Sequence, residues 1–453
     1  AGGTITNAVT FSNTGTVTLA GTTAFTGGVT ATAPSSRTIN GTVTAAGTGV
    51  INFGTVSITG DSTIGGTSTG QITLGAATLS DGVTLTVGAG AGTPISLSTV
   101  TGTASGTASN LTINTTGTVT VSGAVGTDIG TVTITQSGGT TFSSTVNAAT
   151  VTLTNTTGTI TFSGALTATT LSTAAQGYNV AINAGGTITN AVTFSNTGTV
   201  TLGDASGDSI TFTGGVTATA PSQVNIAGTV QSTNTAISIG DSGTPIVLNA
   251  NTTISAGSGD ITLGGTVNGG STLTLNTTGT TTLSGIIGGS TALTSLTTNS
   301  GGTVAINTTA ITTTGAQTFG ENATLGADVT LTSNSSGNIS FAGTIESTSS
   351  ARALTINTSG TTTFSGTVGA TSPYLASVTT DSGGTTAING GSVRTTGAQT
   401  YNDNVTLGAD TTLTASTVSF SGTLDSTTSA RDLTFGASTG NVTFTGAVGS
   451  STA

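Results

Sequence analysis

Long phrases of this sequence occur twice, and this repetition limits the architectures open to the chain. Residues 1–19 read AGGTITNAVTFSNTGTVTL, and residues 184–202 repeat them letter for letter, 183 positions later (184 − 1). The phrase FTGGVTATAPS occurs at 25–35 and again at 212–222, which is 187 positions later (212 − 25). The second copy therefore contains four additional residues around Gly203–Asp208, and a Gly- and Asp-rich insertion of this kind predicts a loop.

Shorter phrases repeat at closer spacing. The phrases LTINTTGTVTVSG, LTLNTTGTTTLSG and LTINTSGTTTFSG begin at residues 111, 273 and 354, so their separations are 162 (273 − 111) and 81 (354 − 273). A related phrase begins at residue 151, 40 positions (151 − 111) after the first. Periods near 40 and 80 indicate a basic unit of about 20 residues, which is typical of stacked solenoid repeats.

Alternation inside each unit predicts strands. Apolar residues alternate with threonine or serine, as in Val17-Thr18-Leu19 and Val329-Thr330-Leu331. Successive side chains of a strand point to opposite faces, so we expect Val, Ile, Leu and Phe to point inward and Thr and Ser outward. The strong helix formers Glu, Lys, Arg and Gln are scarce, while Gly, Asn and Asp suit corners. The sequence therefore predicts an all-β, right-handed parallel β-solenoid (β-helix) with coils of ~20 residues.

We expect one continuous solenoid over residues 1–453, with sub-repeats at about 1–183, 184–272, 273–353 and 354–453. Tandem β-sandwich domains are the alternative, since the period near 80 residues approaches the size of an immunoglobulin domain. The chain has no Trp and three Tyr, and no Pro-rich or charged linker separates the units. The period near 40 residues is also difficult to place inside one sandwich domain, so the solenoid is favoured.

A third pair of phrases carries a resemblance to a known group of proteins. TTTGAQTFGENATLGADVTLT begins at Thr312, and RTTGAQTYNDNVTLGADTTLT begins at Arg394, 82 positions later (394 − 312). Together with the Leu-Thr-(Ile/Leu)-Asn-Thr-x-Gly phrases, they resemble giant bacterial β-strand-repeat surface proteins, similar to filamentous-haemagglutinin-like and autotransporter-associated repeats. The resemblance covers nearly the whole chain. It implies secretion, a location at the bacterial cell surface, a right-handed β-helix, and roles in adhesion, biofilm or filament building.

Composition excludes several kinds of function. The sequence has no Cys and no His, so Ser–His–Asp and Cys–His catalysis and Cys/His zinc sites are impossible. Fifteen acids against four basic residues, all arginine, give a net charge of −11, which disfavours nucleic acid. No apolar run approaches the ~20 residues of a transmembrane helix. We therefore expect a chain that is not an enzyme and has no catalytic residues, no cofactor and no transmembrane segment.

Acidic residues provide the remaining candidates for site chemistry. Asp204 and Asp208 lie in the inserted GDASGDS, and Asp with backbone carbonyls can bind Ca²⁺. We expect turn formation at these residues and keep a weak calcium site as the alternative. The calcium-binding nonapeptide pattern G-G-x-G-x-D-x-U-x is not repeated in the sequence, and Asp260 in GSGDITL matches it only in part, with shifted spacing. Carboxylate pairs can cleave glycans, and Asp403 with Asp410 is the other candidate pair. No aromatic platform accompanies either pair, so turn chemistry is again favoured.

Other polar residues recur at fixed positions. Asparagines follow strand phrases at Asn114, Asn276, Asn357, Asn183, Asn307 and Asn389, where they could form amide ladders along the stack or tolerate corner conformations. Arg352 and Arg431 occupy matching positions, and we expect ion pairs with Glu346 and with Asp425 or Asp432, respectively. For Tyr178, Tyr374 and Tyr401 we expect loop anchoring rather than carbohydrate stacking.

The sequence leaves three functions open. The first is a structural fibre or stalk segment of a large secreted surface protein. The second is a self-assembling filament or sheath subunit that stacks head to tail, since open solenoid ends associate. The third is an adhesin that binds glycans or partner cells. Because the chain begins and ends inside its own repeat pattern, we expect it to be a segment of a longer array or to stack end to end on itself.

Overall fold

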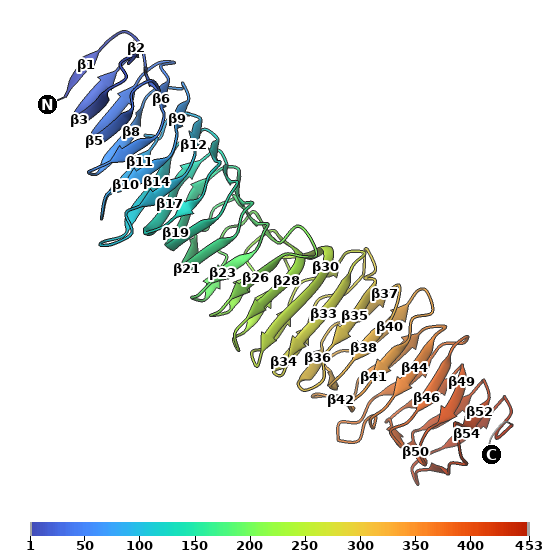
Figure 1. The fold of residues 1–453 in the computed structure, drawn as a ribbon. Coiled ribbons are helices and arrows are strands. Elements are labelled where there is room, and N and C mark those ends of the chain that lie inside the picture. Colours follow the sequence, from blue (N-terminus) through green and yellow to red (C-terminus); the bar gives the residue numbers. More distant parts are fainter. Residues whose placement is uncertain (1, 451–453) are drawn as a thin grey trace. The chain divides into compact units, whose positions relative to one another are not determined.

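The computed structural model describes residues 2–450 and contains only β-strands and connecting segments. Among these residues the structure has no helix that is long and apolar enough to cross a membrane. The chain divides into two compact units, residues 1–223 and 224–453. Figure 1 shows the strands stacked coil upon coil within each unit. The predicted continuity of one solenoid over 1–453 concerns the relation between the units and stays a prediction.

Three strands make one coil of the first unit. After β7, β8 and β9, the chain returns to the same side at β10, where Ala77 pairs in parallel with Val56, an offset of 21 (77 − 56). Later coils vary in length: Leu166 pairs with Val146 at an offset of 20 (166 − 146), and Val125 pairs with Val100 at an offset of 25 (125 − 100). These pairings are parallel, as are those of the second unit such as β40–β43, so the predicted parallel β-solenoid is confirmed.

The strands of the first unit are β1 (Gly3–Ile5), β2 (Val9–Thr10), β3 (Thr16–Phe25), β4 (Val29–Ala31), β5 (Ser36–Ala45), β6 (Ile51–Phe53), β7 (Val56–Ile58), β8 (Ser62–Gly66), β9 (Ile72–Leu74), β10 (Ala77–Leu79), β11 (Thr84–Val87), β12 (Ile95–Leu97), β13 (Val100–Gly102), β14 (Ser109–Asn114), β15 (Val119–Val121), β16 (Val125–Gly126), β17 (Ile129–Ser137), β18 (Thr140–Phe142), β19 (Val146–Thr156), β20 (Thr159–Phe162), β21 (Leu166–Thr173), β22 (Asn179–Ile182), β23 (Gly186–Ile188), β24 (Val192–Thr193), β25 (Thr199–Leu202), β26 (Ser209–Phe212) and β27 (Val216–Ala218).

The strands of the second unit are β28 (Gln223–Ser232), β29 (Ile237–Ile239), β30 (Ile246–Gly257), β31 (Ile261–Leu263), β32 (Val267–Asn268), β33 (Thr272–Thr277), β34 (Thr280–Leu283), β35 (Ser295–Thr298), β36 (Thr303–Ile306), β37 (Ala310–Thr313), β38 (Gln317–Phe319), β39 (Asn322–Leu325), β40 (Val329–Ser333), β41 (Ile339–Phe341), β42 (Ile345–Ser347), β43 (Ala353–Asn357), β44 (Thr361–Phe364), β45 (Ser377–Thr380), β46 (Thr385–Ile388), β47 (Ser392–Arg394), β48 (Ala398–Tyr401), β49 (Asn404–Leu407), β50 (Thr411–Thr414), β51 (Thr417–Phe420), β52 (Leu424–Ser426), β53 (Leu433–Phe435) and β54 (Asn441–Phe444).

Apolar side chains fill the interior of each coil, as the alternation predicts. In β40, Val329 and Leu331 are buried while Thr330 between them is half-exposed. Rings stack on one another from coil to coil: the centroids of Phe319 and Phe341 are 4.7 Å apart, and those of Tyr401 and Phe420 are 5.2 Å apart. Offset aromatic stacking adds to the area that each ring buries, so these rows strengthen the contact between neighbouring coils.

Threonine departs from the predicted outward orientation. Many threonines lie on the inner face, among them Thr298 of β35 and Thr313 of β37, which are almost fully buried. Threonine has nearly the shape of valine, and its hydroxyl can bond locally: the Thr313 hydroxyl donates to the Gly315 carbonyl at 2.6 Å. The prediction that Thr and Ser point outward is therefore wrong at these positions, because a paired hydroxyl can be buried at little cost.

The repeat that spans 82 positions (394 − 312) does not equal a whole number of coils. In the second unit, Gln317 belongs to the ladder β35–β38–β41–β44–β46–β49–β52, whereas its equivalent Gln399 belongs to β37–β40–β43–β45–β48–β51–β54. The chain passes three strand positions per coil, so the repeat stops one strand short of four coils. Equivalent residues of successive repeats consequently occupy different faces of the solenoid.

Candidate functional site

The inserted loop that holds Asp204 and Asp208 closes on itself. Oδ2 of Asp208 accepts hydrogen bonds from the backbone amides of Asp204 and Ala205, at 2.8 and 2.7 Å. The Asp204 side chain is exposed and Asp208 is half-buried. Within residues 2–450 no three Asp, Glu, His or Cys side chains gather as a metal site would require. The geometry matches the turn interpretation, and the calcium alternative stays a prediction.

The other acidic candidates also serve the backbone. Asp260 and Asp410 cap the following coil: Oδ1 of Asp260 accepts the Thr280 amide at 2.7 Å, and Oδ1 of Asp410 accepts the Asp432 amide at 3.2 Å. Asp403, by contrast, is buried. Because one carboxyl of this pair is interior and the other is exposed on a corner, they do not converge on a common substrate position.

The recurrent asparagines form an amide contact between coils at Asn114 but no continuous ladder. One coil away from Asn114, Asn276 and Asn357 stand Gln136, Ser255 and Thr332. The Asn307 and Asn389 side chains lie instead over glycines, with Oδ1 only 2.0 and 2.1 Å from where a Cβ would sit on Gly326 and Gly408. Oδ1 of Asn183 is buried with no partner among the described residues. Nε2 of Gln136 donates to Oδ1 of Asn114 at 3.0 Å, so one amide pair joins neighbouring coils. Asn299 stands one coil beyond Asn276, but its Oδ1 accepts the Thr277 amide instead. An amide contact between coils is therefore present at Asn114, whereas no continuous ladder runs through the six recurrent asparagines.

A buried polar cluster in the second unit was not foreseen as a cluster. Oδ1 of Asp403 accepts hydrogen bonds from the hydroxyls of Thr380 and Thr386, each at 2.9 Å, and Oδ2 accepts from Thr386 at 2.9 Å. Nearby, Nε2 of Gln399 donates to the carbonyls of Val393 and Thr414, at 3.0 and 3.1 Å. The Tyr401 hydroxyl donates to Oε1 of Gln399 at 3.1 Å, so the interior amide is satisfied at both ends.

The preceding repeat contains an incomplete version of this cluster. Gln317 donates to the carbonyls of Ile311 and Thr332, at 3.3 and 2.9 Å, as its equivalent does. Phe319 stands where the later repeat has tyrosine, and Oε1 of Gln317 has no partner. The Glu321 carboxyl accepts the Thr298 hydroxyl at 2.7 Å through Oε2, while its buried Oε1 has no partner. An unpaired buried acceptor is costly, so the two clusters differ in stability.

Burial changes the acidity of these interior groups. Burial raises the pKa of the Asp403 carboxyl, hydrogen bonds from Thr380 and Thr386 lower it in part, and the nearby charge of Asp381 raises it further. Burial also raises the pKa of the Glu321 carboxyl against the opposing effect of Thr298. Perturbed carboxyls can mark active sites, but these two are enclosed by the coil interior and approached only by neighbouring protein groups.

Arg352 does not form the predicted ion pair with Glu346. The Glu346 carboxylate is occupied by the next coil, because it accepts the backbone amides of Ala370 and Thr371 at 3.1 and 3.0 Å. Nε of Arg352 and Nε of Arg431 are buried with no partner among the described residues. The expected Arg352–Glu346 pair is therefore wrong, since backbone amides take up the carboxylate.

The three tyrosines have three different roles. Tyr178 anchors a loop as predicted: its hydroxyl donates to the Leu153 carbonyl and accepts the Ala174 amide, both at 2.9 Å. Burial raises the pKa of this phenol to about 12. Tyr401 belongs to the interior row of rings rather than to a loop. Tyr374 lies at the surface with the Arg394 guanidinium over its ring, 3.7 Å from the centroid.

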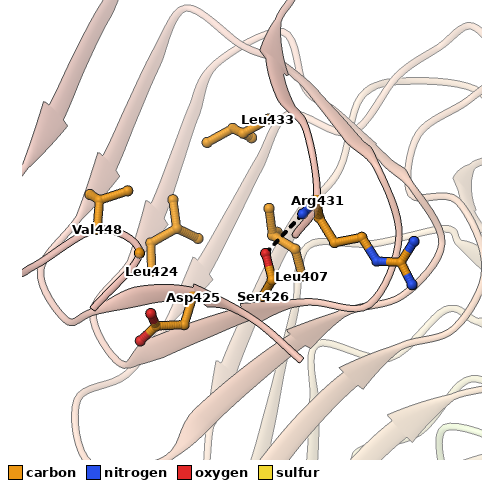
Figure 2. Close-up of a pocket in the computed structure, with 8 residues that line it drawn as sticks. Leu407, Leu424, Asp425, Ser426, Arg431, Leu433 and Val448 are labelled. Carbon is orange, nitrogen blue, oxygen red and sulfur yellow. Dashed lines mark hydrogen bonds between the residues drawn. The ribbon is translucent and has the colours of Figure 1, made fainter. Parts of the chain in front are cut away.

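An apolar cavity of about 250 Å³ lies near the last described coil of the second unit. Figure 2 shows Leu407, Leu424, Leu433 and Val448 around it, with the Arg431 guanidinium pointing away and the Arg431 amide bonded to Oγ of Ser426. Val448 is 57% exposed, so this cavity is solenoid interior that the described residues leave uncovered. Asp425 and Ser426 also line it, and Oγ of Ser426 accepts the Arg431 amide at 3.1 Å.

No family model, no curated protein and no solved structure matches this chain. The fold alone therefore defines its class, which is that of parallel β-solenoid repeat proteins. Asp208, Asp260 and Asp410 accept backbone amides, and Asp403 accepts threonine hydroxyls in the interior. Sequence reasoning could have found the interior cluster, because Gln, an aromatic ring and an acid recur at the same positions of the two TTGAQT phrases.

Proposed function

We propose that this chain is a structural spacer: a stalk segment of a large secreted repeat protein at a bacterial cell surface. The observation that supports it is the stacking of coil upon coil by parallel ladders within each unit. In such folds each repeat contacts only its neighbours, so stability grows with the number of coils and needs no globular centre. A chain of this kind can be lengthened or shortened without redesigning its core.

The hydrogen bonds made by the polar side chains support a structural rather than a catalytic role. Asn338, Asn322 and Asn404 each use Oδ1 to accept a threonine amide of the next coil, at 2.9, 3.0 and 2.9 Å. Each such bond ties one coil to the following one and satisfies an amide at a corner. We propose no cofactor and no catalytic activity, since Asp208, Asp260 and Asp410 accept backbone amides and Glu321 and Asp403 are enclosed in the core.

The surface location rests on the resemblance to bacterial β-strand-repeat proteins and on composition. The sequence has no Cys, Met, Trp or His, and it therefore lacks the side chains most easily oxidised outside the cell. An antibody raised against the purified chain tests this location by immunogold microscopy of intact source cells. Gold on intact cells supports the proposal, whereas gold only after permeabilisation contradicts it.

Light scattering of the purified chain separates the spacer from a self-assembling subunit. A spacer segment is expected at a mass near the 42.8 kDa of one chain. Mass that rises with concentration, together with filaments in negative-stain images, would instead favour head-to-tail stacking, because non-closing contacts produce fibres.

A further inference from the structure

A surface groove in the second unit has the composition of a binding site. It encloses about 310 Å³, which lies at the lower end of the ~300–1,000 Å³ typical of ligand pockets. Its lining residues come from four successive coils and are Tyr374, Arg394, Thr395, Thr396, Thr414, Ala415, Ser416 and Ser438. The lining thus combines an aromatic ring, a cation and several hydroxyl groups, with no carboxylate among them.

The ring and the cation are held against each other by the coil stacking. Leu375, next to Tyr374, pairs in parallel with Thr395, next to Arg394. This register places the Arg394 guanidinium 3.7 Å from the centroid of the Tyr374 ring. A guanidinium stacked on an aromatic face keeps its N–H groups in its own plane. The stacked arginine is therefore oriented to present N–H donors to a ligand, with little conformational freedom left to lose on binding.

Arg394 differs from the other arginines of the chain. The Arg37 guanidinium is buried and donates to backbone carbonyls, including that of Thr55 at 3.1 Å. Nε of Arg352 and Nε of Arg431 are buried. Arg394, Arg352 and Arg431 are all half-exposed as residues, but only Arg394 among the described arginines stacks on an aromatic ring. In a chain of net charge −11, an arginine placed in a groove without acids marks a local site for an anion.

The preceding repeat provides an internal comparison. At the same offset of 82 (394 − 312), Ala292 stands in place of Tyr374 and Thr312 in place of Arg394. Thr313, Thr314 and Thr332 match the hydroxyl residues Thr395, Thr396 and Thr414. The hydroxyl framework is thus common to both repeats, whereas the ring and the cation occur together in the later one. Packing of the coil does not require the pair, because the earlier repeat folds the same phrase without it.

We propose that the Tyr374–Arg394 groove binds an acidic saccharide, with a uronic acid unit as the recognised group. The Arg394 guanidinium forms two parallel hydrogen bonds with the sugar carboxylate, a geometry that suits this pair. The Tyr374 ring packs on the apolar face of the sugar. The hydroxyls of Thr396, Thr414, Ser416 and Ser438 lie along the groove to bond sugar hydroxyls, whereas the buried Thr395 hydroxyl donates to the Gly397 carbonyl. This inference stands apart from the spacer role, which needs no groove.

Trigalacturonate binding to the full chain tests the proposal, with neutral galactotriose as the comparison. Tyr178 and Tyr401 are buried and the chain has no Trp, so a change in tyrosine fluorescence on binding reports mainly on Tyr374. Isothermal calorimetry gives the affinity independently. Arg394→Thr and Tyr374→Ala restore the residues of the preceding repeat. Arg431→Thr is the matched control, since it removes the same charge from a residue that lines the other cavity and not this groove.

The expected result is saturable binding of trigalacturonate, with affinity lowered about tenfold or more by Arg394→Thr, as the loss of a charge-assisted pair predicts. Tyr374→Ala should weaken binding as well, and Arg431→Thr should leave it unchanged. Equal losses in Arg394→Thr and Arg431→Thr would show non-specific attraction and overturn the proposal. So would equal affinity for galactotriose, or no saturable binding by the wild-type chain.

Discussion

Replacing Phe319 by tyrosine is expected to stabilise the coil that contains it. Oε1 of Gln317 is buried with no partner, and Phe319 stands two residues further along the same strand. In the next repeat, the hydroxyl of Tyr401 supplies the missing donor to Oε1 of Gln399 at 3.1 Å. The ring stacks are also alike, with interplanar angles of 13° for Phe319–Phe341 and 17° for Tyr401–Phe420. The Phe319→Tyr hydroxyl should therefore reach the same acceptor.

The size of the effect follows from one buried acceptor. An unsatisfied buried group costs about 1–3 kcal/mol, and the new hydroxyl must itself be removed from water. The net gain in Phe319→Tyr should be about 1 kcal/mol, or roughly a fivefold change in the opening equilibrium. The reciprocal change Tyr401→Phe leaves Oε1 of Gln399 unpaired and should lower local stability by about 1–3 kcal/mol.

Native-state hydrogen exchange measures this effect locally, which matters because long repeat arrays need not unfold in one step. The Gln317 amide, which donates to the Asn338 carbonyl at 2.9 Å, is the reporter. Its exchange should slow about fivefold in Phe319→Tyr. Phe341→Tyr is the control, since it adds a hydroxyl to the same row of rings. Equal or faster exchange in Phe319→Tyr than in that control would refute the reasoning.

Three further predictions concern the acid, the rings and the loop. Burial raises the pKa of the Asp403 carboxyl in the folded chain. Above that pKa the buried carboxylate is charged and lowers the free energy of unfolding. This loss of stability disappears when the pH falls below the pKa of about 3.9 that the carboxyl has in the unfolded chain. The melting temperature should rise as pH falls from 7 to about 4, and Asp403→Asn should raise it at pH 7 and flatten the profile; an unchanged profile in Asp403→Asn would contradict this. Phe420→Ala should cost about 3–5 kcal/mol in urea unfolding, whereas Phe444→Ala should cost far less because Phe444 is 42% exposed; equal losses would show that the row of rings adds little. Since the Asp208 carboxylate already caps the loop that holds Asp204, melting should be the same in EDTA and in millimolar calcium, and a calcium-dependent increase would revive the metal site.

The coil could be predicted from the sequence because its signal is periodic. Alternation in phrases such as Val329-Thr330-Leu331 specifies which side chains point inward, and the spacing of repeated phrases gives the coil length. The rotation of the TTGAQT repeat by one face could not be predicted. It depends on how many residues each corner uses, as the unequal lengths of the coils that end at Leu166 and Val125 show.

The sites were harder to predict because they depend on contacts between coils. Asp403 resembles any turn residue in the sequence, and only the stacking brings the hydroxyls of Thr380 and Thr386 to its carboxylate. Tyr374 and Arg394 are distant in the sequence and meet because they stand one coil apart. The recurrent asparagines depend on register in the same way, because it brings the Gln136 amide to Asn114 but glycines to Asn307 and Asn389.

The spacer account requires a fixed advance per coil, and paired spin labels measure this most directly. The chain has no cysteine, so cysteines at half-exposed Thr330 and Ser419, four coils apart on one ladder of the second unit, label only these positions. A second pair at Ala310 and Thr443 spans six coils on the same ladder. At ~4.8 Å per coil, the two Cα distances should be about 19 and 29 Å. The distances measured by double electron–electron resonance for the two label pairs should differ by about 10 Å. Distances that do not increase with the number of coils between the labels would contradict the account.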